Sequence, residues 1–352
     1  MHHTNQLNQK TMTTFNNQFF GTNHGNKTQS LDMGVISETF QNTKGMAHTF
    51  GIEIECLLPY DADLTKLQRM NVACVRDGSI QSMGGHTAVE FVTGVLTGDR
   101  GVKQLKAILK ELNKQGAKVN RSCGIHVHIG GASFNRQFSA NAIRLGYQLQ
   151  DELYSMMPPS RQNNSYCKKI SDNIGWNTRE QKNETIANYV FGAVELNNRY
   201  NKKCDLGRYP SNRYSWLNLV RCNTASRGET IEFRLHSGTT DFKKIFNWLL
   251  ICMSITNFAE NNEKQIWRNE KHNTYQGGKY RVSLWEVLIC SMDERSARLL
   301  INYCNRRCKI MDNPTIAKRC YYKHTHGSFS KFFRGIKIFN KIAEGEPTIA
   351  IS

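Results

Sequence analysis

Two short segments of the chain place polar side chains at every second position, between apolar ones. The first is Gly51-Ile52-Glu53-Ile54-Glu55, and the second is Cys123-Gly124-Ile125-His126-Val127-His128. Successive side chains of a β-strand point to opposite faces, so Glu53 and Glu55 share one face, as do His126 and His128. The aliphatic residues then face a core. This pattern predicts a rigid sheet that displays carboxylates and imidazoles for a cation on its other face.

The segment from Thr230 to His236 shows the same alternation. We expect Glu232, Arg234 and His236 on one face of this strand and the intervening apolar residues on the other. Ligation by several carboxylates and one histidine suits Mg²⁺ or Mn²⁺ better than Zn²⁺. Such cations bridge phosphate oxygens, and an arginine can neutralise charge on a transferred phosphoryl group. Arg234 is positioned for that role, or else it is an ion-pair partner of Glu232.

Each polar pair also has a plainer interpretation. A Glu-x-Glu pair on a surface strand is usually solvated, and an imidazole can bond a phosphate or a carboxylate instead of a metal. The neighbours of Glu53, which include Phe50 and Leu57, are too apolar for an edge strand. Buried like charges are tolerated mainly where a cation neutralises them, so the pattern favours the metal hypothesis.

Apolar spacing predicts the other elements. Strands are expected over residues 47–58, 72–76, 89–93, 214–222 and 229–236. A helix or turn is expected over 64–70, and helices over 101–114, 135–157, 242–258, 284–292 and 297–304. This order predicts an α+β fold with a mainly antiparallel sheet and packing helices, rather than a doubly wound sheet. Neither Gly-x-Gly-x-x-Gly nor a Walker pattern is present, so side chains and metals would have to hold any nucleotide.

Composition divides the chain into three parts. Residues 1–45 hold seven Asn, five Gln and eight Thr without a sustained apolar period, which predicts a disordered leader. We expect a catalytic domain over residues 46–260 and a helical, basic region over residues 261–352 that packs on it. No apolar run approaches the roughly 20 residues of a membrane span, and a signal-peptide layout is missing. We therefore expect a cytoplasmic protein without a membrane partner, whose 11 cysteines are reduced thiols.

Half of the formal net charge of +18 lies near the C-terminus. Residues 302–341 contain ten Lys or Arg and one acid, Asp312. This stretch predicts either an acidic or nucleic-acid partner or a solvated basic surface. The spacing of Cys304, Cys308, Cys320 and His324 fits a structural zinc site, or two helices with buried thiols. We expect neither this stretch nor the leader to belong to the catalytic machinery.

Five motifs occur in an order that resembles the amidoligase family. They are Gly51-Ile52-Glu53-Ile54-Glu55, Asp77-Gly78-Ser79, Glu90-Phe91-Val92, Ser122-Cys123-Gly124-Ile125-His126-Val127-His128 and Ile231-Glu232-Phe233-Arg234. The family is similar to glutamine synthetase and glutamate-cysteine ligase, which are carboxylate-amine ligases, and the resemblance covers about residues 47–260. It implies an ATP-dependent ligase whose curved antiparallel sheet, of the glutamine synthetase type, forms a funnel for ATP and divalent ions. The chain departs from the family pattern at Thr93-Gly94, where Ser-Pro is expected, and beyond about residue 260.

The resemblance also implies roles for individual residues. The metal ligands that it implies are Glu53, Glu55, Glu90, His126 and Glu232. His128 would face the phosphates, Arg234 would contact the γ-phosphate, and Asn218 would lie near the nucleotide or an acyl phosphate. Asp77 would orient the substrate or take a proton from the amine. The implied cofactors are ATP and Mg²⁺, with Mn²⁺ as an alternative, and the implied substrates are a carboxylate and an amine, either of which could belong to a peptide or protein.

Three functions are compatible with these features. The first is a ligase that forms an amide or isopeptide bond through an acyl phosphate. The second is a hydrolase that keeps the same metals and uses bound water on an amide or phosphoester. The third is a non-catalytic protein that binds nucleic acid through its basic C-terminal region. Amine-dependent release of ADP would separate the first from the second, and salt-sensitive nucleic-acid binding without ATP turnover would mark the third.

Overall fold

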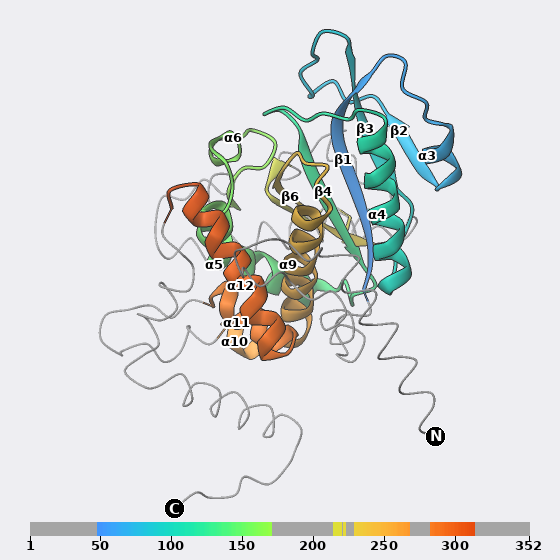
Figure 1. The fold of residues 1–352 in the computed structure, drawn as a ribbon. Coiled ribbons are helices and arrows are strands. Elements are labelled where there is room, and N and C mark those ends of the chain that lie inside the picture. The colour runs from blue at the N-terminus through green and yellow to red at the C-terminus, as the bar shows by residue number, and fades with distance from the viewer. Residues whose placement is uncertain (1–47, 171–213, 220, 223–228, 268–281, 314–352) are drawn as a thin grey trace, which may run out of the picture.

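The computed structural model describes residues 48–170, 214–219, 221–222, 229–267 and 282–313. Six strands form one antiparallel sheet in the order β2-β3-β1-β4-β6-β5 (Figure 1). The strands are β1 (Thr49–Pro59), β2 (Val72–Val75), β3 (His86–Thr93), β4 (Gly124–Gly130), β5 (Leu217–Asn218) and β6 (Thr230–Ser237). Helices accompany this sheet, so the predicted α+β class with an antiparallel sheet is confirmed.

The helices occur mostly where apolar spacing predicts them. They are α3 (Thr65–Arg69), α4 (Gly98–Lys114), α5 (Arg136–Tyr154), α6 (Pro159–Gln162), α9 (Phe242–Asn261), α10 (Glu263–Trp267), α11 (Leu284–Ser291) and α12 (Glu294–Ile310). The side chain of Asn135 accepts from the Phe138 amide and so begins α5, which ends three residues before the predicted Met157. Pro159 then occupies the first turn of α6, a short helix that the sequence did not predict.

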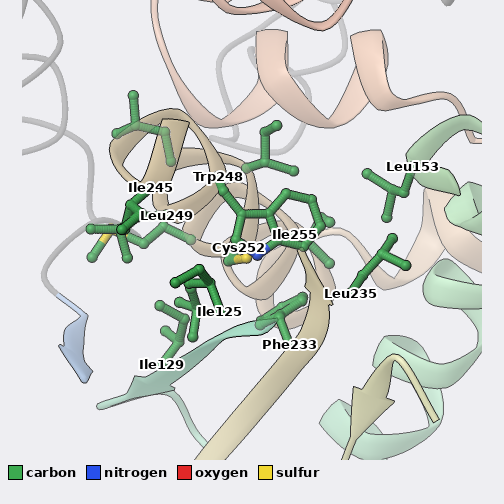
Figure 2. Packing of buried hydrophobic residues seen from close by; sticks show 14 of the residues in the cluster. Ile125, Ile129, Leu153, Phe233, Leu235, Ile245, Trp248, Leu249, Cys252 and Ile255 are labelled. Carbon is green, nitrogen blue, oxygen red and sulfur yellow. The ribbon is translucent and has the colours of Figure 1, made fainter. Parts of the chain in front are cut away.

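Helix α9 covers the apolar face of the central strands. Figure 2 shows Ile245, Trp248 and Leu249 of α9 above Ile125 of β4 and Phe233 of β6. All five of these side chains are buried. Asp241 begins the helix by accepting hydrogen bonds from the amides of Lys243 and Lys244. The apolar face of the sheet that the sequence predicted therefore packs against α9 and forms one side of the main core.

Helix α4 joins the same core beside α9. Leu105, Ile108, Leu109 and Leu112 form its buried stripe, at the helical spacing that predicted it. The chain leaves the helix through Gly116, whose φ of +76° lies in the left-handed region that glycine adopts most easily.

Helices α11 and α12 also contribute to this core. Ser283 and Glu286 form a capping box at the start of α11, and Leu284 and Leu288 are buried with the side chains of α9. Cys304 and Cys308 of α12 are buried thiols in the same core. Cys320 and His324 lie outside the described residues, so the zinc site stays a prediction. The leader and the basic stretch beyond residue 313 lie outside them as well. Among the described helices, none has both the length and the apolar character of a membrane span.

Two sequence-based expectations about the last strands are wrong. The strand expected over 214–222 is shorter, since β5 spans only Leu217 and Asn218, although Trp216 also accepts a hydrogen bond from the Arg234 amide. His236 does not share a face with Glu232, because the pairing of β4 with β6 shifts: Val127 lies opposite Phe233, whereas Ile125 lies opposite His236. An extra residue in β6, a β-bulge, therefore turns His236 into the core, where its ring lies 5.7 Å from that of Trp248.

Candidate functional site

The pairing of the central strands brings the predicted polar residues onto the face opposite α9. Glu53 of β1 lies opposite His126 of β4, and Glu55 lies opposite Glu90 of β3. His128 lies opposite Glu232 of β6, which in turn lies opposite Asn218 of β5. The register of five strands thus assembles one polar surface from segments that are far apart in the sequence.

One group of possible ligands consists of Glu53, His128 and Glu232, whose ligand atoms all lie within 4.8 Å of one another. Nε2 of His128 lies 3.0 Å from Oε1 of Glu53, and Nδ1 lies 3.4 Å from the hydroxyl of Thr230. Asn218 donates from Nδ2 to Oε2 of Glu232 over 2.6 Å. We call these three ligand residues the first cluster.

A second cluster consists of Glu55, Asp77 and Glu90, again with ligand atoms within 4.8 Å. Gly124 donates its amide to Oε2 of Glu55 over 2.6 Å, which fixes that carboxylate. The Asp77 carboxylate accepts from the amide of Ser79 over 2.7 Å, so the predicted turn is present. Sequence reasoning expected Asp77 beside the substrate or amine, and the structure places it among the carboxylates.

A small apolar cluster supports the turn that carries Asp77. Leu57 lies on the same face of β1 as the carboxylates and packs with Ile80 and Cys123, all of them buried. The turn is also held by Asn120, which donates from Nδ2 to the carbonyl of Gln81 over 2.7 Å. Packing beneath the turn therefore holds Asp77 near Glu55, although the two residues are 22 positions apart.

His126 lies between the two clusters. Its Nδ1 is 2.7 Å from Oε2 of Glu53, and its Nε2 is 3.3 Å from Oε1 of Glu55. The family resemblance implied His126 as a metal ligand and His128 as a phosphate contact. In the structure, His128 is grouped with Glu53 and Glu232, and Nδ1 of His126 also lies 3.7 Å from Oε1 of Glu232. Both histidines therefore border the first cluster, and the roles implied for them stay predictions.

The charges of the site shift several pKa values. Burial alone would raise the pKa of Glu53, but hydrogen bonds with His126 and His128 outweigh it and hold that pKa well below its ordinary value. Burial would also raise the pKa of Glu232, and the charges of His128, Arg234 and His126 lower it overall. Burial and the neighbouring carboxylates raise the pKa of Glu90 to about 7. The carboxylates of Glu53 and Glu232 are therefore ionised at neutral pH, as coordination of a cation requires. Burial would lower the pKa of His128, but the hydrogen bond with Glu53 and the charge of Glu232 raise it overall, so a cation that binds at His128 has to displace its proton.

Arg234 is fixed beside the first cluster. Its Nη1 forms an ion pair with Oε1 of Glu232, and its Nε donates to the carbonyl of Tyr166 over 3.3 Å. Within the described residues, Nη2 of Arg234 has no hydrogen-bond partner. The ion pair that sequence reasoning gave as the alternative is thus present, and it leaves one edge of the guanidinium able to meet an anion.

Arg161 is a polar residue near the site that sequence reasoning missed. It follows a Pro-Pro pair in a polar segment, where a single arginine gives no signal of burial. In the structure only 2% of its surface is exposed. Its guanidinium donates to the carbonyls of Leu235 and Arg234, over 3.0 and 2.6 Å, and lies beside Gly124.

The donor set of both clusters fits hard divalent cations. Five carboxylates and one imidazole make up the two clusters, whereas structural zinc sites mostly use thiolates and imidazoles. Oxygen-rich ligation suits Mg²⁺ and Mn²⁺. Chemically, two such sites beside an arginine can neutralise several negative charges at once, as on the phosphates of a nucleotide.

Two solved structures show a limited similarity to this chain. One is a bifunctional glutathione synthetase from Pasteurella multocida, with 11% identity, a TM-score of 0.38 and coverage of 82% of this chain and 49% of that one. The chain thus spans about half the length of that protein. The other is a novel glutamine synthase homolog, with 11% identity, a TM-score of 0.33 and coverage of 82% and 74%. Because both TM-scores are low, we draw no conclusion from them.

A comparison with curated proteins gives no match. The sequence itself matches the model of one protein family over residues 58–256, which is more than half of the chain. The match contains Asp77, Glu90, both histidines of β4, Glu232 and Arg234. The family is described as "Putative amidoligase enzyme", and the chain belongs to it.

Proposed function

We propose that this protein is an ATP- and Mg²⁺-dependent carboxylate-amine ligase that forms an amide or isopeptide bond. The observation that carries the proposal is the pair of ligand clusters on one face of the sheet, joined by His126 and adjoined by Arg234. Membership of the amidoligase family supports the same conclusion. Divalent cations and a fixed arginine beside a polyanionic substrate are the general solution for transfer of a phosphoryl group, which is the first step of this reaction.

The residues of the site have separate roles in this proposal. Glu53, His128 and Glu232 would hold one Mg²⁺, and Glu55, Asp77 and Glu90 would hold a second, with Mn²⁺ as an alternative. These cations would supply positive charge that neutralises the phosphates of ATP. His126 orients Glu53 and Glu55 through its two ring nitrogens. Asn218 orients the Glu232 carboxylate that it contacts.

Arg234 would bind the γ-phosphate of ATP with Nη2, since Nε and Nη1 are held by Tyr166 and Glu232 among the described residues. In the first step, a carboxylate oxygen of the acid substrate attacks the γ-phosphorus, the bond to the bridging oxygen breaks, and ADP leaves. Negative charge develops on the transferred phosphoryl oxygens, where a fixed guanidinium stabilises it without reorganisation. The ion pair with Glu232 and the bond to Tyr166 fix Arg234 in advance.

The second step would form the new bond. The amine nitrogen attacks the carbonyl carbon of the acyl phosphate, the bond from that carbon to the phosphate oxygen breaks, and inorganic phosphate leaves. The proton of the attacking amine passes to a base. The place of Asp77 beside Glu55 and Glu90 supports a role as a cation ligand, and acceptance of this proton is the alternative. The acid and the amine could each belong to a small molecule, a peptide or a protein.

The first test is calorimetric titration of the full chain with Mg·ATP. The double change Glu53→Ala with Glu55→Ala removes one carboxylate from each cluster and should abolish Mg²⁺-dependent nucleotide binding. Glu294→Ala with Asp151→Ala is the matched control, because these two helix carboxylates pair with Arg298 and Lys169 away from the site. Unchanged Mg·ATP affinity in the site variant would contradict the assignment of the site.

A second measurement identifies the reaction. Release of ADP from the wild-type chain should require a carboxylate and rise when an amine is added, because the amine consumes the acyl phosphate. ADP release that is independent of every amine, with hydrolysis of an amide or phosphoester, would favour a hydrolase on the same clusters.

A further inference from the structure

The β-bulge in β6 changes the hydrogen bonds around Arg234. An interval of two residues on β4, from Ile125 to Val127, lies opposite an interval of three on β6, from Phe233 to His236. Arg234 and Leu235 therefore have no partner residue in the pairing with β4. Buried carbonyl groups that leave a ladder must find other donors, because an unpaired carbonyl in the interior is costly.

Arg161 supplies those donors. Its Nη2 donates to the carbonyl of Arg234 over 2.6 Å, and its Nε donates to the carbonyl of Leu235 over 3.0 Å. A guanidinium presents these two N–H groups in one plane, so it can bond two successive carbonyls at once. On its other side the Arg234 amide donates to the carbonyl of Trp216 over 2.7 Å. Arg161 and Trp216 together therefore fix the backbone from which the Arg234 side chain extends.

The segment that carries Arg161 also contacts the Arg234 side chain. Five residues after Arg161, the carbonyl of Tyr166 accepts from Nε of Arg234 over 3.3 Å. The same segment is held in place because the thiol of Cys167 contacts the Arg161 carbonyl and the Tyr154 hydroxyl donates to the Cys167 carbonyl. One short stretch of chain thus holds both the main chain and the side chain of Arg234.

The position of Arg161 is close to the ligand clusters as well. A methyl group added at Gly124 would lie 3.2 Å from Nη2 of Arg161 and 3.3 Å from Nε2 of His126. A side chain at this position would therefore make the guanidinium or the His126 ring give way by a few tenths of an ångström. A buried arginine there adds positive charge behind Arg234, and its side chain donates to main-chain carbonyls.

We propose that Arg161 is a positioning residue that holds the β6 bulge in the shape that aims Arg234 at the terminal phosphate of the nucleotide. This inference rests on the proposed function, since it assigns Arg161 a role through Arg234. Arg161 itself touches neither phosphate nor cation in this role. Its effect should therefore appear in discrimination between ATP and ADP, because only ATP has the phosphate that Arg234 binds.

The test compares the affinity of the full chain for a non-hydrolysable ATP analogue and for ADP, each with Mg²⁺, by calorimetry. Wild type should prefer the triphosphate, and Arg234→Ala should lose that preference. Arg161→Met keeps a long apolar stem but no donor, so it should reduce the triphosphate preference by about tenfold or more, the equivalent of one hydrogen bond to a charged group. Its affinity for ADP should change by less than about threefold.

Arg144→Met is the matched control. Arg144 also donates from Nε to a main-chain carbonyl, that of Ile266, over 3.0 Å, but it lies on α5. This variant should keep the wild-type preference for the triphosphate even if it is less stable. The double variant Arg161→Met with Arg234→Ala should distinguish the triphosphate from ADP no less well than Arg234→Ala alone. Both changes remove the same contact, that of Arg234 with the terminal phosphate.

Four results would overturn the inference. A folded Arg161→Met variant with the wild-type preference would reduce Arg161 to a structural residue, as would an equal loss of affinity for both nucleotides. If Arg161→Met does not fold, Arg161→Lys takes its place, since it keeps the charge but cannot bond two carbonyls as a planar fork. An Arg161→Lys variant with the full wild-type preference would also overturn the inference. A wild-type chain that binds no Mg·nucleotide would refute the proposed function itself, and the role of Arg161 with it.

Discussion

His236 gives the chain an acid-sensitive stability that the β-bulge creates. The side chain is fully buried beside Trp248, and burial lowers its pKa from 6.5 to about 3. The carbonyl of Ser237 acts in the opposite direction by accepting from Nδ1, and the nearby charges of Arg307, Arg161 and Lys244 lower the pKa further. His236 is therefore neutral in the folded chain at every pH above about 3.

The sign and size of the effect follow from these two pKa values. Below pH 6.5 the unfolded chain binds a proton at this histidine and the folded chain does not, so the free energy of unfolding falls as the pH falls from 6.5 towards 3. Each pH unit in this window costs about 1.4 kcal/mol. At pH 5, about 1.5 units below the ordinary pKa, wild type should have lost about 2 kcal/mol through His236 alone.

The assay is urea unfolding at pH 7.5 and pH 5.0 in the presence of a chelator, followed by circular dichroism. His236→Phe keeps a ring beside Trp248 and removes the titratable group. Its loss of stability between the two pH values should be about 2 kcal/mol smaller than that of wild type. Phe233→Leu is the control, since it weakens packing on the same face of β6 and should keep the wild-type loss. Equal losses in wild type and His236→Phe would refute the placement of this histidine in the core.

Two further predictions concern the site and its support. Arg234→Ala should lower kcat by about a hundredfold or more, and it should raise the KM for ATP by a smaller factor, because the lost contact with the γ-phosphate also weakens ATP binding. Arg234→Lys should not restore kcat fully, and unchanged steady-state turnover in Arg234→Ala would reduce Arg234 to an ion-pair partner. Gly238→Ala should destabilise the chain by about 1–3 kcal/mol in urea unfolding, because the new methyl would lie 2.4 Å from Cβ of Cys123. Gly84→Ala, which meets nothing within 4 Å, should have little effect, and equal stabilities of these two variants would contradict the packing around Cys123.

The sequence predicted the central strands well because alternation is a local property. Every second residue of β1 and β4 lies on the face of the sheet that is buried in the core. Glu53 and His126 could therefore be assigned to the other face without the structure. The bulge in β6 could not be predicted, since one extra residue leaves no mark in an apolar pattern. His236 was therefore placed on the wrong face.

The partners within the site depend on strand register, which a single sequence does not specify. Asp77 meets Glu90 because Val75 of β2 pairs with Glu90 of β3, and nothing in the spacing of these residues indicates that register. Arg161 gave no signal for a different reason. Its guanidinium bonds main-chain carbonyl groups of another segment. Because every residue has such a carbonyl, no residue type in the sequence marks the partners of Arg161.

The first and second clusters differ in how they should respond to partial opening of the chain. Glu53, His128 and Glu232 lie on β1, β4 and β6, whose other faces are buried in the core. In the second cluster, Asp77 follows β2, an edge strand of four residues with an exposed end. Backbone amides of the central strands should exchange with heavy water only through global unfolding, and those around Asp77 through local opening. The first cluster should therefore persist until the whole chain unfolds, whereas Asp77 should be able to leave Glu55 and Glu90 while the rest of the chain stays folded.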